Sequence, residues 1–341
     1  MSLSIEKQQT VAIVTGANTG VGYGIVQRLL EEDCSIKIVM ACRNFSRAKR
    51  AQSSLLNQFP FADIDIELVD LNSVRSVLEF CAHIKAKFHR VHLLFFNAAS
   101  LSTFGINWSD ILWLFLKDPV GLMERSDATI QVRGEINQDG MGSMFAANVF
   151  GHYIIARELE KELDASGDGR IMWTSSLTAE KRLFNIDDWQ GVKSFLPYES
   201  SKWACDLVAL GSNEKYKEQG SKIVSYSTAP GVVASTIGNL PSWIRRVRIW
   251  IHYIFRFCGV TSQNITGYRG AIATVFVALQ PQLLDYFVRY TSATTPWGRS
   301  YVTSVPIEGY DKKEASKLLQ HCEAAYQAWK QRLDPDHSLG S

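Results

Sequence analysis

The sequence lacks paired cysteines, an excess of charge of one sign, and an apolar segment at its start. The six cysteines are widely spaced with no CxxC pair, which predicts free thiols in a reducing compartment and no metal or redox centre. The 36 basic and 34 acidic residues leave a formal charge of +2, so no nucleic-acid partner is expected. Because the N-terminus, MSLSIEKQQT, is polar, we expect no export signal and no glycosylation at Asn44, Asn107 or Asn264. The main fold is expected to face the cytosol.

The sequence also has no internal repeat and no low-complexity segment. Instead, short apolar runs alternate with longer helical patterns. Six runs predict strands: VAIVT (11–15), IKIVMA (36–41), IDIELV (64–69), VHLLFF (91–96), RIMWTS (170–175) and IVSYSTA (223–229). Continuous apolar strands separated by helices indicate a parallel sheet that is covered on both faces. The prediction is an α/β protein with a doubly wound (Rossmann) parallel sheet and helices on both faces.

The length and composition favour one large domain over several small ones. The chain has 341 residues, 46% of them hydrophobic, so residues 1–341 are expected to form a single domain. Three stretches, 99–140, 177–197 and 232–262, are too long to be simple connections. Insertions of this kind usually shape a substrate site or a partner surface. We expect them to form the substrate site and a membrane-facing surface.

The first predicted strand runs into TGANTGVG, residues 15–22, which an amphipathic helical pattern follows. Gly16, Gly20 and Gly22 stand where a chain must turn tightly, approach a pyrophosphate and let a helix pack against a strand. A phosphate there would rest on the helix N-terminus, where unpaired N–H groups and the helix dipole favour negative charge. The stretch predicts a dinucleotide-binding loop.

The end of the second strand bears on the choice of cofactor. A carboxylate there would bind the ribose hydroxyls of NADH, but the candidate positions hold Cys42 and Arg43. A guanidinium can pair with a 2′-phosphate, so Arg43 predicts NADPH, and a solvated surface arginine is the alternative. Two further pairs follow strands: Asp70 and Leu71, expected beside the adenine ring, and Asn97 and Ala98, expected on the path to the nicotinamide.

Three side chains carry the predicted chemistry. Ser176 ends the fifth strand, and Tyr198 and Lys202, four apart, share one face of the following helix. Reducing a ketone by hydride transfer creates an alkoxide that must be protonated, and a phenol with a pKa of about 10 is poorly matched to neutral pH. An ammonium about 4 Å away favours the phenolate by roughly 4 kcal/mol at an effective dielectric near 20, so we expect Lys202 to bring the pKa of Tyr198 near neutrality. Ser176 can then hold the substrate oxygen.

Several motifs, in order, resemble the short-chain dehydrogenase/reductase superfamily across most of the chain: TGANTGVG, DL at 70–71, NAA at 97–99, Asn148, Ser176, Tyr198 with Lys202, and PGVVAS at 230–235. The resemblance implies a catalytic tetrad in which Asn148 joins Ser176, Tyr198 and Lys202 by holding a water in the proton relay to Lys202. It implies cofactor binding by Gly16, Asn18, Thr19, Gly20, Val21, Gly22, Arg43, Asp70, Leu71, Asn97, Ala98, Tyr198, Lys202, Pro230, Gly231, Val233 and Ser235.

Two positions depart mildly from the superfamily pattern. Ala99 stands where glycine is usual, and Ser235 stands where threonine is common. Neither change removes a reacting group. His152, one turn after Asn148, is expected to be a structural residue.

A narrower resemblance covers nearly the whole chain. ACRNFSRA (41–48), INWSDILWLF (106–115), ANVFGHY (147–153), IMWTSSLTAEK (171–181) and YTSATTPWGRSY (290–301) are similar to the 3-keto sterol reductases of post-squalene sterol synthesis. This implies NADPH-dependent reduction of the C-3 ketone of a 4-methyl sterol to the 3β-hydroxyl during C-4 demethylation. It also implies possible contact with other enzymes of that pathway and a place on the cytosolic face of the endoplasmic reticulum or on lipid droplets.

Residues 242–258 have the pattern of a helix that lies in a membrane interface. One stripe is apolar: Trp243, Ile244, Val247, Trp250, Ile251, Ile254 and Cys258. Another is basic: Arg245, Arg248, His252 and Arg256. Such a helix places its apolar face among acyl chains and its arginines among headgroups, whereas the arginines exclude a membrane span. The alternative is a lid helix whose apolar stripe covers the sterol pocket or a dimer seam.

Two other functions remain open. A reductase of another lipophilic carbonyl, such as retinal or a 17-keto steroid, would share the TGANTG and ACR motifs, but the long insertion after Asn97 and the ATTPWGR stretch argue against it. A dinucleotide-binding scaffold that has lost activity commonly lacks the tyrosine or the lysine, and both are present. Residues 311–333 predict an amphipathic helix packed on the domain, with a partner-binding role as the alternative.

Overall fold

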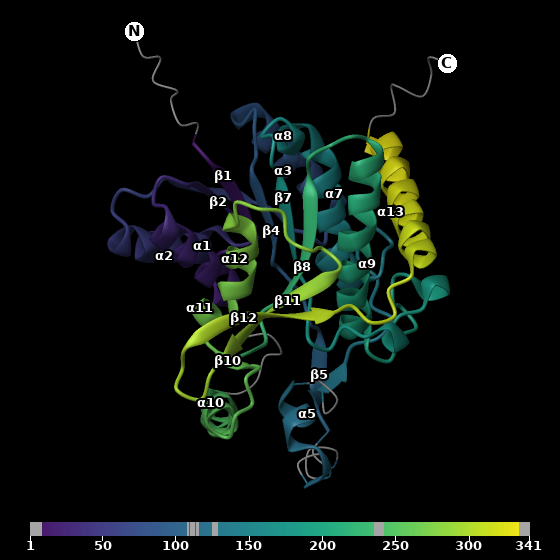
Figure 1. The fold of residues 1–341 in the computed structure, drawn as a ribbon. Coiled ribbons are helices and arrows are strands. Elements are labelled where there is room, and N and C mark those ends of the chain that lie inside the picture. The colour runs from purple at the N-terminus through teal and green to yellow at the C-terminus, as the bar shows by residue number, and fades with distance from the viewer. Residues whose placement is uncertain are drawn as a thin grey trace, which may run out of the picture.

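The computed structural model describes residues 9–107, 109, 113, 116–124, 129–234 and 242–333, and its centre is an eight-stranded sheet (Figure 1). The strands lie in the order β12-β11-β8-β7-β4-β1-β2-β3. Their bounds are β1 Val11–Thr15, β2 Lys37–Cys42, β3 Ile64–Leu68, β4 Leu93–Phe96, β7 Arg170–Thr174, β8 Val224–Ala229, β11 Val288–Thr294 and β12 Ser300–Pro306. All six predicted strands are confirmed.

Neighbouring strands are parallel except β11 and β12, which form an antiparallel hairpin at one edge. Strands β1, β2 and β7 are buried along their whole length, as expected for a sheet covered on both faces. The strand order reverses direction between β1 and β4, and folds of this kind bind ligands at the carboxyl ends beside such a point. The doubly wound α/β fold is confirmed.

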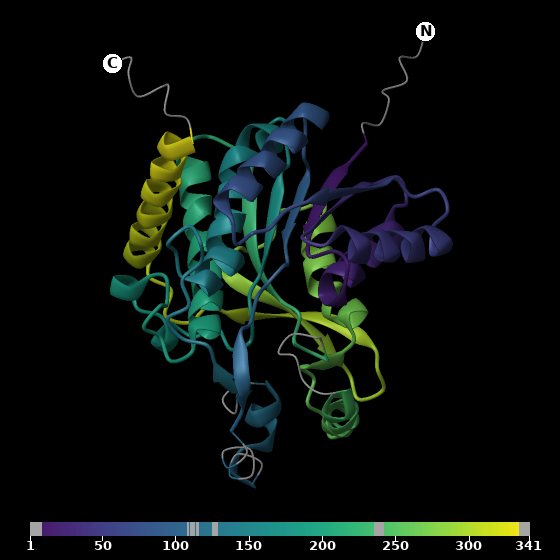
Figure 2. The same ribbon diagram turned by 180° about the vertical axis from the view of Figure 1, so that it is seen from behind.

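Helices cover both faces of the sheet (Figures 1 and 2). The side chains of α1, α2 and α12 share one apolar core with the sheet, and those of α3, α7, α9 and α13 share the other. Their bounds are α1 Gly20–Glu32, α2 Phe45–Gln58, α3 Val74–Lys87, α7 Gly151–Glu158, α9 Pro197–Glu218, α12 Ile272–Leu279 and α13 Lys312–Leu333. The helix predicted over 311–333 is therefore confirmed, and it packs on α9, where a Cβ on Gly211 would lie 2.9 Å from Leu319.

The remaining elements are short or lie in the insertions. They are β5 Thr103–Ile106, α5 Pro119–Glu124, β6 Thr129–Gln131, α6 Ser143–Phe145, the π-helix η1 Ala146–Phe150, α8 Glu160–Asp164, the 3₁₀ helices η2 Lys181–Leu183 and η3 Ile186–Asp188, β9 Val232–Val233, α10 Ser242–Phe257, β10 Gln263–Ile265 and α11 Gly267–Gly270.

Two of these segments project from the same end of the molecule, beyond the carboxyl edge of the sheet. One carries β5, β6 and α5, and the other carries α10 (Figures 1 and 2). A hydrogen bond from the Ser262 hydroxyl to the Glu124 carboxylate joins the two segments. No helix in the described part of the chain is both long and apolar enough to cross a membrane.

Candidate active site

The glycine loop needs glycine for its backbone conformation at two positions and for close packing at a third. Gly16 (φ +66°) and Gly20 (φ +57°) adopt the left-handed conformation that favours glycine. A Cβ on Gly22 would lie 2.4 Å from the Gly16 carbonyl oxygen, so α1 starts directly against the loop. A Cβ on Gly24 would lie 2.5 Å from the carbonyl oxygen of Gly267, which brings α1 equally close to α11.

The start of α1 fits an anionic ligand. No side chain caps this helix, and its first turn contains no acidic residue. The unpaired N–H groups and the helix dipole there favour negative charge. Nothing lies within 4 Å of a Cβ built on Gly20, so a ligand can approach the backbone of the loop. These features fit the pyrophosphate of a dinucleotide, held by the loop that contains Asn18, Thr19 and Val21.

Thr15, the last residue of β1, ties this loop to the end of β4. Its hydroxyl oxygen accepts the backbone N–H groups of Asn97 at 2.9 Å and Ala98 at 3.0 Å. The side-chain amide of Asn97 donates to the Thr15 carbonyl oxygen at 2.9 Å. Asn97 and Ala98 therefore lie beside the glycine loop. Sequence reasoning missed Thr15, whose only signal was a hydroxyl at the end of a buried strand.

Arg43 follows β2 and is exposed. The Gly16 N–H group donates to the carbonyl oxygen of Ala41 at 2.8 Å, so the end of β2 lies against the glycine loop. The preceding thiol, Cys42, is buried, and burial raises its pKa to about 11. Of the two residues Cys42 and Arg43, therefore, Arg43 is the one that presents a charged group to solvent. Recognition of a 2′-phosphate would require such a group.

Asp70 and Leu71, after β3, lie in a turn that Asp70 itself stabilises. The Asp70 carboxylate accepts the Asn72 N–H group at 3.0 Å. The Leu71 carbonyl lies against the start of α7, since a Cβ on Gly151 would be 2.6 Å from its oxygen. Both residues are partly exposed at the same edge of the sheet as the glycine loop.

The segment after β8 also reaches this edge. Gly231 has φ +64°, and a Cβ there would lie 2.4 Å from the side-chain nitrogen of Asn264. The Asn264 amide donates to the carbonyl oxygen of Pro230 at 2.7 Å, which fixes the turn. Val233 lies in β9, which pairs with β10. Ser235 lies outside the described residues.

Lys202 joins the first turns of α9 to the end of β7. Its side chain is only 2% exposed, and its Nζ donates to the carbonyl oxygen of Thr174 at 2.8 Å. The Ser175 hydroxyl donates to the Lys202 carbonyl oxygen at 3.2 Å. Ser176 follows directly, and its Oγ accepts the N–H group of Thr178 at 3.2 Å. These contacts bring Ser176 and Lys202 to one edge of the sheet.

Tyr198 opens α9 and is partly exposed, with the Lys202 Nζ 5.6 Å from the centre of its ring. Burial raises the pKa of the Tyr198 phenol, and the negative charge of Glu199 adds to that effect. Burial also lowers the pKa of Lys202. The pKa of Tyr198 therefore departs in the direction opposite to the one expected from its spacing to Lys202. The physical reason is that both groups lie in a poorly solvated region, where each charged form is disfavoured.

Asn148 lies in the π-helix η1, and hydrogen bonds to neighbouring groups hold its side chain in place. Its side-chain oxygen accepts the Ser100 N–H group at 2.7 Å, and its amide donates to the Ser100 carbonyl oxygen at 3.1 Å and the Ser201 hydroxyl at 2.9 Å. The Ser201 hydroxyl in turn donates to the Tyr198 carbonyl oxygen at 2.6 Å. Asn148 thus connects the start of the 99–140 insertion to the helix that carries Tyr198 and Lys202.

Gln131, at the end of β6 in the same insertion, also contacts this helix. Its side-chain oxygen accepts the Tyr198 N–H group at 3.0 Å, and its amide donates to the Glu199 carboxylate at 2.7 Å. Gln131 and Glu199 are both buried. The N-cap residue of α9 is Leu196, whose side chain cannot accept a hydrogen bond, and Gln131 supplies the missing acceptor. Sequence reasoning missed this contact.

The described part of α10 turns its apolar side chains outward. Trp250 (70% exposed), Ile254 (61%) and Phe257 (68%) face solvent, and Phe257 contacts Trp297 in the β11–β12 turn. His252 and Arg256, from the expected basic stripe, are buried instead. The side chains of 242–248, including Trp243, Ile244 and Val247, lie outside the described residues. In the described part of α10 the exposed apolar side chains do not cover a sterol pocket, and the dimer-seam alternative stays open.

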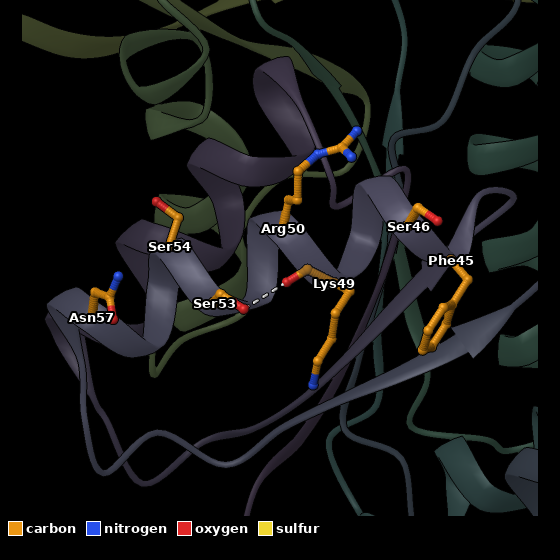
Figure 3. Close-up of a pocket in the computed structure, with 7 residues that line it drawn as sticks. All are labelled: Phe45, Ser46, Lys49, Arg50, Ser53, Ser54 and Asn57. Carbon is orange, nitrogen blue, oxygen red and sulfur yellow. Dashed lines mark hydrogen bonds between the residues drawn. The ribbon is translucent and has the colours of Figure 1, made fainter.

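A shallow hollow of about 540 Å³ lies elsewhere, on the surface of α2. Figure 3 shows that all seven lining residues belong to this one helix: Phe45, Ser46, Lys49, Arg50, Ser53, Ser54 and Asn57. A groove between side chains of a single helix encloses no ligand. We therefore do not assign it to the substrate.

A glycine loop, a buried lysine and a tyrosine at the carboxyl edge of a doubly wound sheet define a dinucleotide-dependent oxidoreductase. The chain belongs to the short-chain dehydrogenase family, because the family model described as short chain dehydrogenase matches residues 10–241. Membership implies an NAD(P)(H) cofactor.

The relatives with similar sequences span almost the whole chain. The human protein named 3-keto-steroid reductase/17-beta-hydroxysteroid dehydrogenase 7 is 32% identical over 315 residues, which cover 91% of each chain. The 3-keto-steroid reductase of Candida glabrata is 30% identical over 341 residues, which cover 96% of each chain. The similarity thus includes the insertions as well as the dinucleotide-binding half.

Solved structures resemble this one at lower identity. An uncharacterised protein from Mycobacterium paratuberculosis has a TM-score of 0.61 at 19% identity, with 94% of each chain covered. L-sorbose reductase from Gluconobacter frateurii, solved with NADPH and L-sorbose, has a TM-score of 0.55 at 18% identity and covers 79% of this chain and 89% of its own. At these identities the likeness concerns the fold alone.

Proposed function

We propose that this protein is an NADPH-dependent 3-keto sterol reductase, which reduces a C-3 ketone to the 3β-hydroxyl during sterol C-4 demethylation. The observation that carries the proposal is the similarity, over nine tenths or more of the chain, to proteins named 3-keto-steroid reductases in animals and yeasts. This similarity extends through the insertion whose Gln131 and Ser100 contact the tyrosine helix and Asn148.

In the proposed reaction, bound NADPH supplies a hydride to the ketone carbon, and the ketone oxygen takes up a proton. Tyr198 is the proposed proton donor. Its phenol carries its proton at neutral pH and is a stronger acid than the alcohol formed from the ketone, so it can give up that proton to the forming alkoxide. Ser176 would hold the substrate oxygen. Lys202 would bind the nicotinamide ribose, and Asn148 would hold a water in the proton relay to Lys202.

The preference for NADPH rests on Arg43. Its guanidinium is exposed beside the glycine loop, where the 2′-phosphate of the adenine ribose would lie in this fold. A planar guanidinium can form two charge-assisted hydrogen bonds with a phosphate.

We also propose that the protein works on a membrane surface, at the cytosolic face of the endoplasmic reticulum or on lipid droplets. A 3-keto sterol is dissolved in membrane, and the exposed Trp250, Ile254 and Phe257 give α10 an apolar face suited to the interface. Other enzymes of sterol C-4 demethylation are the proposed neighbours on that surface.

The direct test is NADPH oxidation by the purified protein in detergent with three carbonyl substrates: a 4-methyl 3-keto sterol, a 17-keto steroid and retinal. Turnover of the 3-keto sterol alone is the expected result. Tight NADPH binding without turnover of any of them would instead favour a dinucleotide-binding scaffold.

One second activity has a specific observation in its favour. The names of the human and rat relatives include 17-beta-hydroxysteroid dehydrogenase 7 as well as 3-keto-steroid reductase. Turnover of the 17-keto steroid at a rate comparable with the 3-keto sterol would establish this second activity for the same site.

A further inference from the structure

Arg256 is a buried cation that has no ion-pair partner among the described residues. Its side chain lies in the last turn of α10 and the residue is only 8% exposed. Its Nε and Nη1 atoms are inaccessible to solvent and make no hydrogen bond within the described part of the chain. Its guanidinium stacks at 4.7 Å on the ring of Tyr253. Burying an unpaired charge is strongly unfavourable, so this arrangement requires a reason.

The end of α10 does not supply that reason. A cation in the last turn of a helix often bonds the terminal carbonyl groups. Here backbone N–H groups already donate to them: Cys258 to Ile254, Gly259 to Arg256, and Val260 to Phe255. Gly259, at φ +94°, makes this turn possible. Three carbonyl groups at the helix end are therefore paired without the Arg256 guanidinium.

A second cation lies close to the first. Arg269, in α11, packs on the β11–β12 turn, since a Cβ on Gly298 would be 3.1 Å from its Nη2. The adjacent Trp297 contacts Phe257, the residue after Arg256, so the end of α10 and Arg269 both meet the same turn. Burial lowers the pKa of Arg256, and the positive charge of Arg269 lowers it further. Two like charges held together favour an anion between them.

The surroundings indicate which anion this is. Trp250, Ile254 and Phe257, on the same helix as Arg256, and Trp297, in contact with Phe257, expose their apolar side chains. A soluble phosphate would not need this apolar rim, whereas a phospholipid presents a phosphate and acyl chains together. Arginine is well suited to phosphate because its planar N–H groups match the oxygens of the anion.

We propose that Arg256 and Arg269 bind the headgroup phosphate of an anionic phospholipid at the C-terminal end of α10. On binding, the Arg256 side chain would turn toward the phosphate, which would supply the acceptors that its Nε and Nη1 lack. Trp250, Ile254, Phe257 and Trp297 would enter the acyl region. The lipid source rests on the membrane contact proposed above. The site itself does not depend on which ketone the enzyme reduces.

Vesicle flotation with the full-length protein tests the proposal, using phosphatidylcholine vesicles with and without phosphatidic acid at physiological salt. Phosphatidic acid should strengthen binding of the wild type about five- to tenfold, and Arg256→Gln or Arg269→Gln should remove most of that gain. Arg75→Gln, which changes an exposed arginine on α3, is the charge-matched control and should retain it. Trp250→Ser should weaken binding to both kinds of vesicle. Equal binding of the wild type and Arg256→Gln would overturn the proposal.

Thermal unfolding without lipid separates ligand binding from a structural role. Removing an unpaired buried charge should leave Tm unchanged or raise it, so a lower Tm for Arg256→Gln would show that the guanidinium has a structural partner and would also overturn the site. If inorganic phosphate raises the Tm of the wild type but vesicle binding does not depend on Arg256, the ligand is a soluble phosphate and the lipid assignment is wrong. Ketone reduction in detergent should be the same in Arg256→Gln and wild type. If the wild type shows no such activity, that result counts against the proposed function and not against the phosphate site.

Discussion

His152 lies between Thr15 and Asn148 and contacts both. Its Nε2 is 3.0 Å from the Thr15 hydroxyl oxygen, and its Nδ1 is 3.2 Å from the Asn148 carbonyl oxygen. Because a carbonyl only accepts, Nδ1 must donate, and Nε2 of the neutral ring is then an acceptor that shares the single Thr15 hydroxyl proton with the Phe95 carbonyl oxygen, 3.1 Å from the same hydroxyl. The ring also stacks on Phe96 at 4.7 Å. One buried imidazole therefore links the glycine loop to the π-helix that carries Asn148.

The first prediction concerns the pH dependence of stability. Burial lowers the pKa of His152 to about 3, whereas an unfolded histidine titrates near 6.5. Below pH 6.5 the unfolded chain binds a proton at this histidine that the folded chain excludes. The contribution of His152 to the free energy of unfolding is therefore complete above pH 6.5 and is lost as the pH falls toward 3. His152 should contribute a slope of about 1.4 kcal/mol per pH unit in this window. Urea denaturation of wild type and His152→Gln at several pH values measures it.

The matched control for this experiment is His89→Gln, which removes an exposed histidine. At pH 8, His152→Gln should still be less stable than wild type by about 1–3 kcal/mol, because the buried partners lose a hydrogen bond. An identical pH slope in His152→Gln and wild type would contradict the assignment of a neutral ring.

The second prediction tests the proton donor. Tyr198→Phe removes only the phenol oxygen, so turnover should fall by at least about 10²–10⁴-fold while the NADPH dissociation constant stays nearly unchanged. Ketone-dependent NADPH oxidation and fluorescence titration measure the two quantities. Tyr301→Phe, on β12, should behave as wild type. Unchanged turnover in Tyr198→Phe would remove the proton-donor role.

The third prediction concerns cofactor choice. Arg43→Asp replaces the guanidinium with a carboxylate that repels a 2′-phosphate and can bind ribose hydroxyls. The ratio of kcat/KM for NADPH to that for NADH should fall by at least about tenfold, which corresponds to about 1.4 kcal/mol. Arg50→Asp, which changes an arginine within α2, is the control. The side chain of Arg50 points away from that of Phe45, near the start of the helix (Figure 3). An unaltered ratio would show that Arg43 does not read the phosphate.

The fourth prediction tests the link between the insertion and the tyrosine helix. Gln131→Met keeps the length of the side chain but removes the acceptor for Tyr198 N–H and the donor to Glu199. The free energy of unfolding should fall by about 1–3 kcal/mol, and kcat should fall more than NADPH affinity. Ile130→Thr changes the exposed neighbour on the same strand and should alter neither. An active, equally stable Gln131→Met protein would show that β6 does not position Tyr198.

The fifth prediction concerns the apolar face of α10. Deleting residues 242–258 should release the protein from membranes, and the double variant Ile254→Ser/Phe257→Ser should weaken the association without removing the helix. Phe61→Ser, which changes a phenylalanine that is 94% exposed far from α10, is the control. Sedimentation of the deletion variant with membranes would place the contact elsewhere.

The sequence determined the strands, the main helices and the positions of the side chains proposed to react. These features depend on patterns within a few residues: continuous apolar runs for buried parallel strands, glycines before a helix, and the four-residue spacing of Tyr198 and Lys202. Such patterns are local because backbone geometry repeats over two or 3.6 residues. The glycine loop, with the strand that precedes it and the helix that follows it, is therefore encoded within a short stretch of the chain.

Tertiary structure alone decided which distant side chains meet. Thr15 and His152 are 137 positions apart, and Gln131 lies 67 positions from Tyr198, so no periodicity relates them. It also decided that the pKa of Tyr198 is raised, since desolvation depends on what surrounds the ring. It buried Arg256, although the sequence pattern places this residue on a basic, exposed stripe. Burial, unlike spacing, is a property of the whole packed chain.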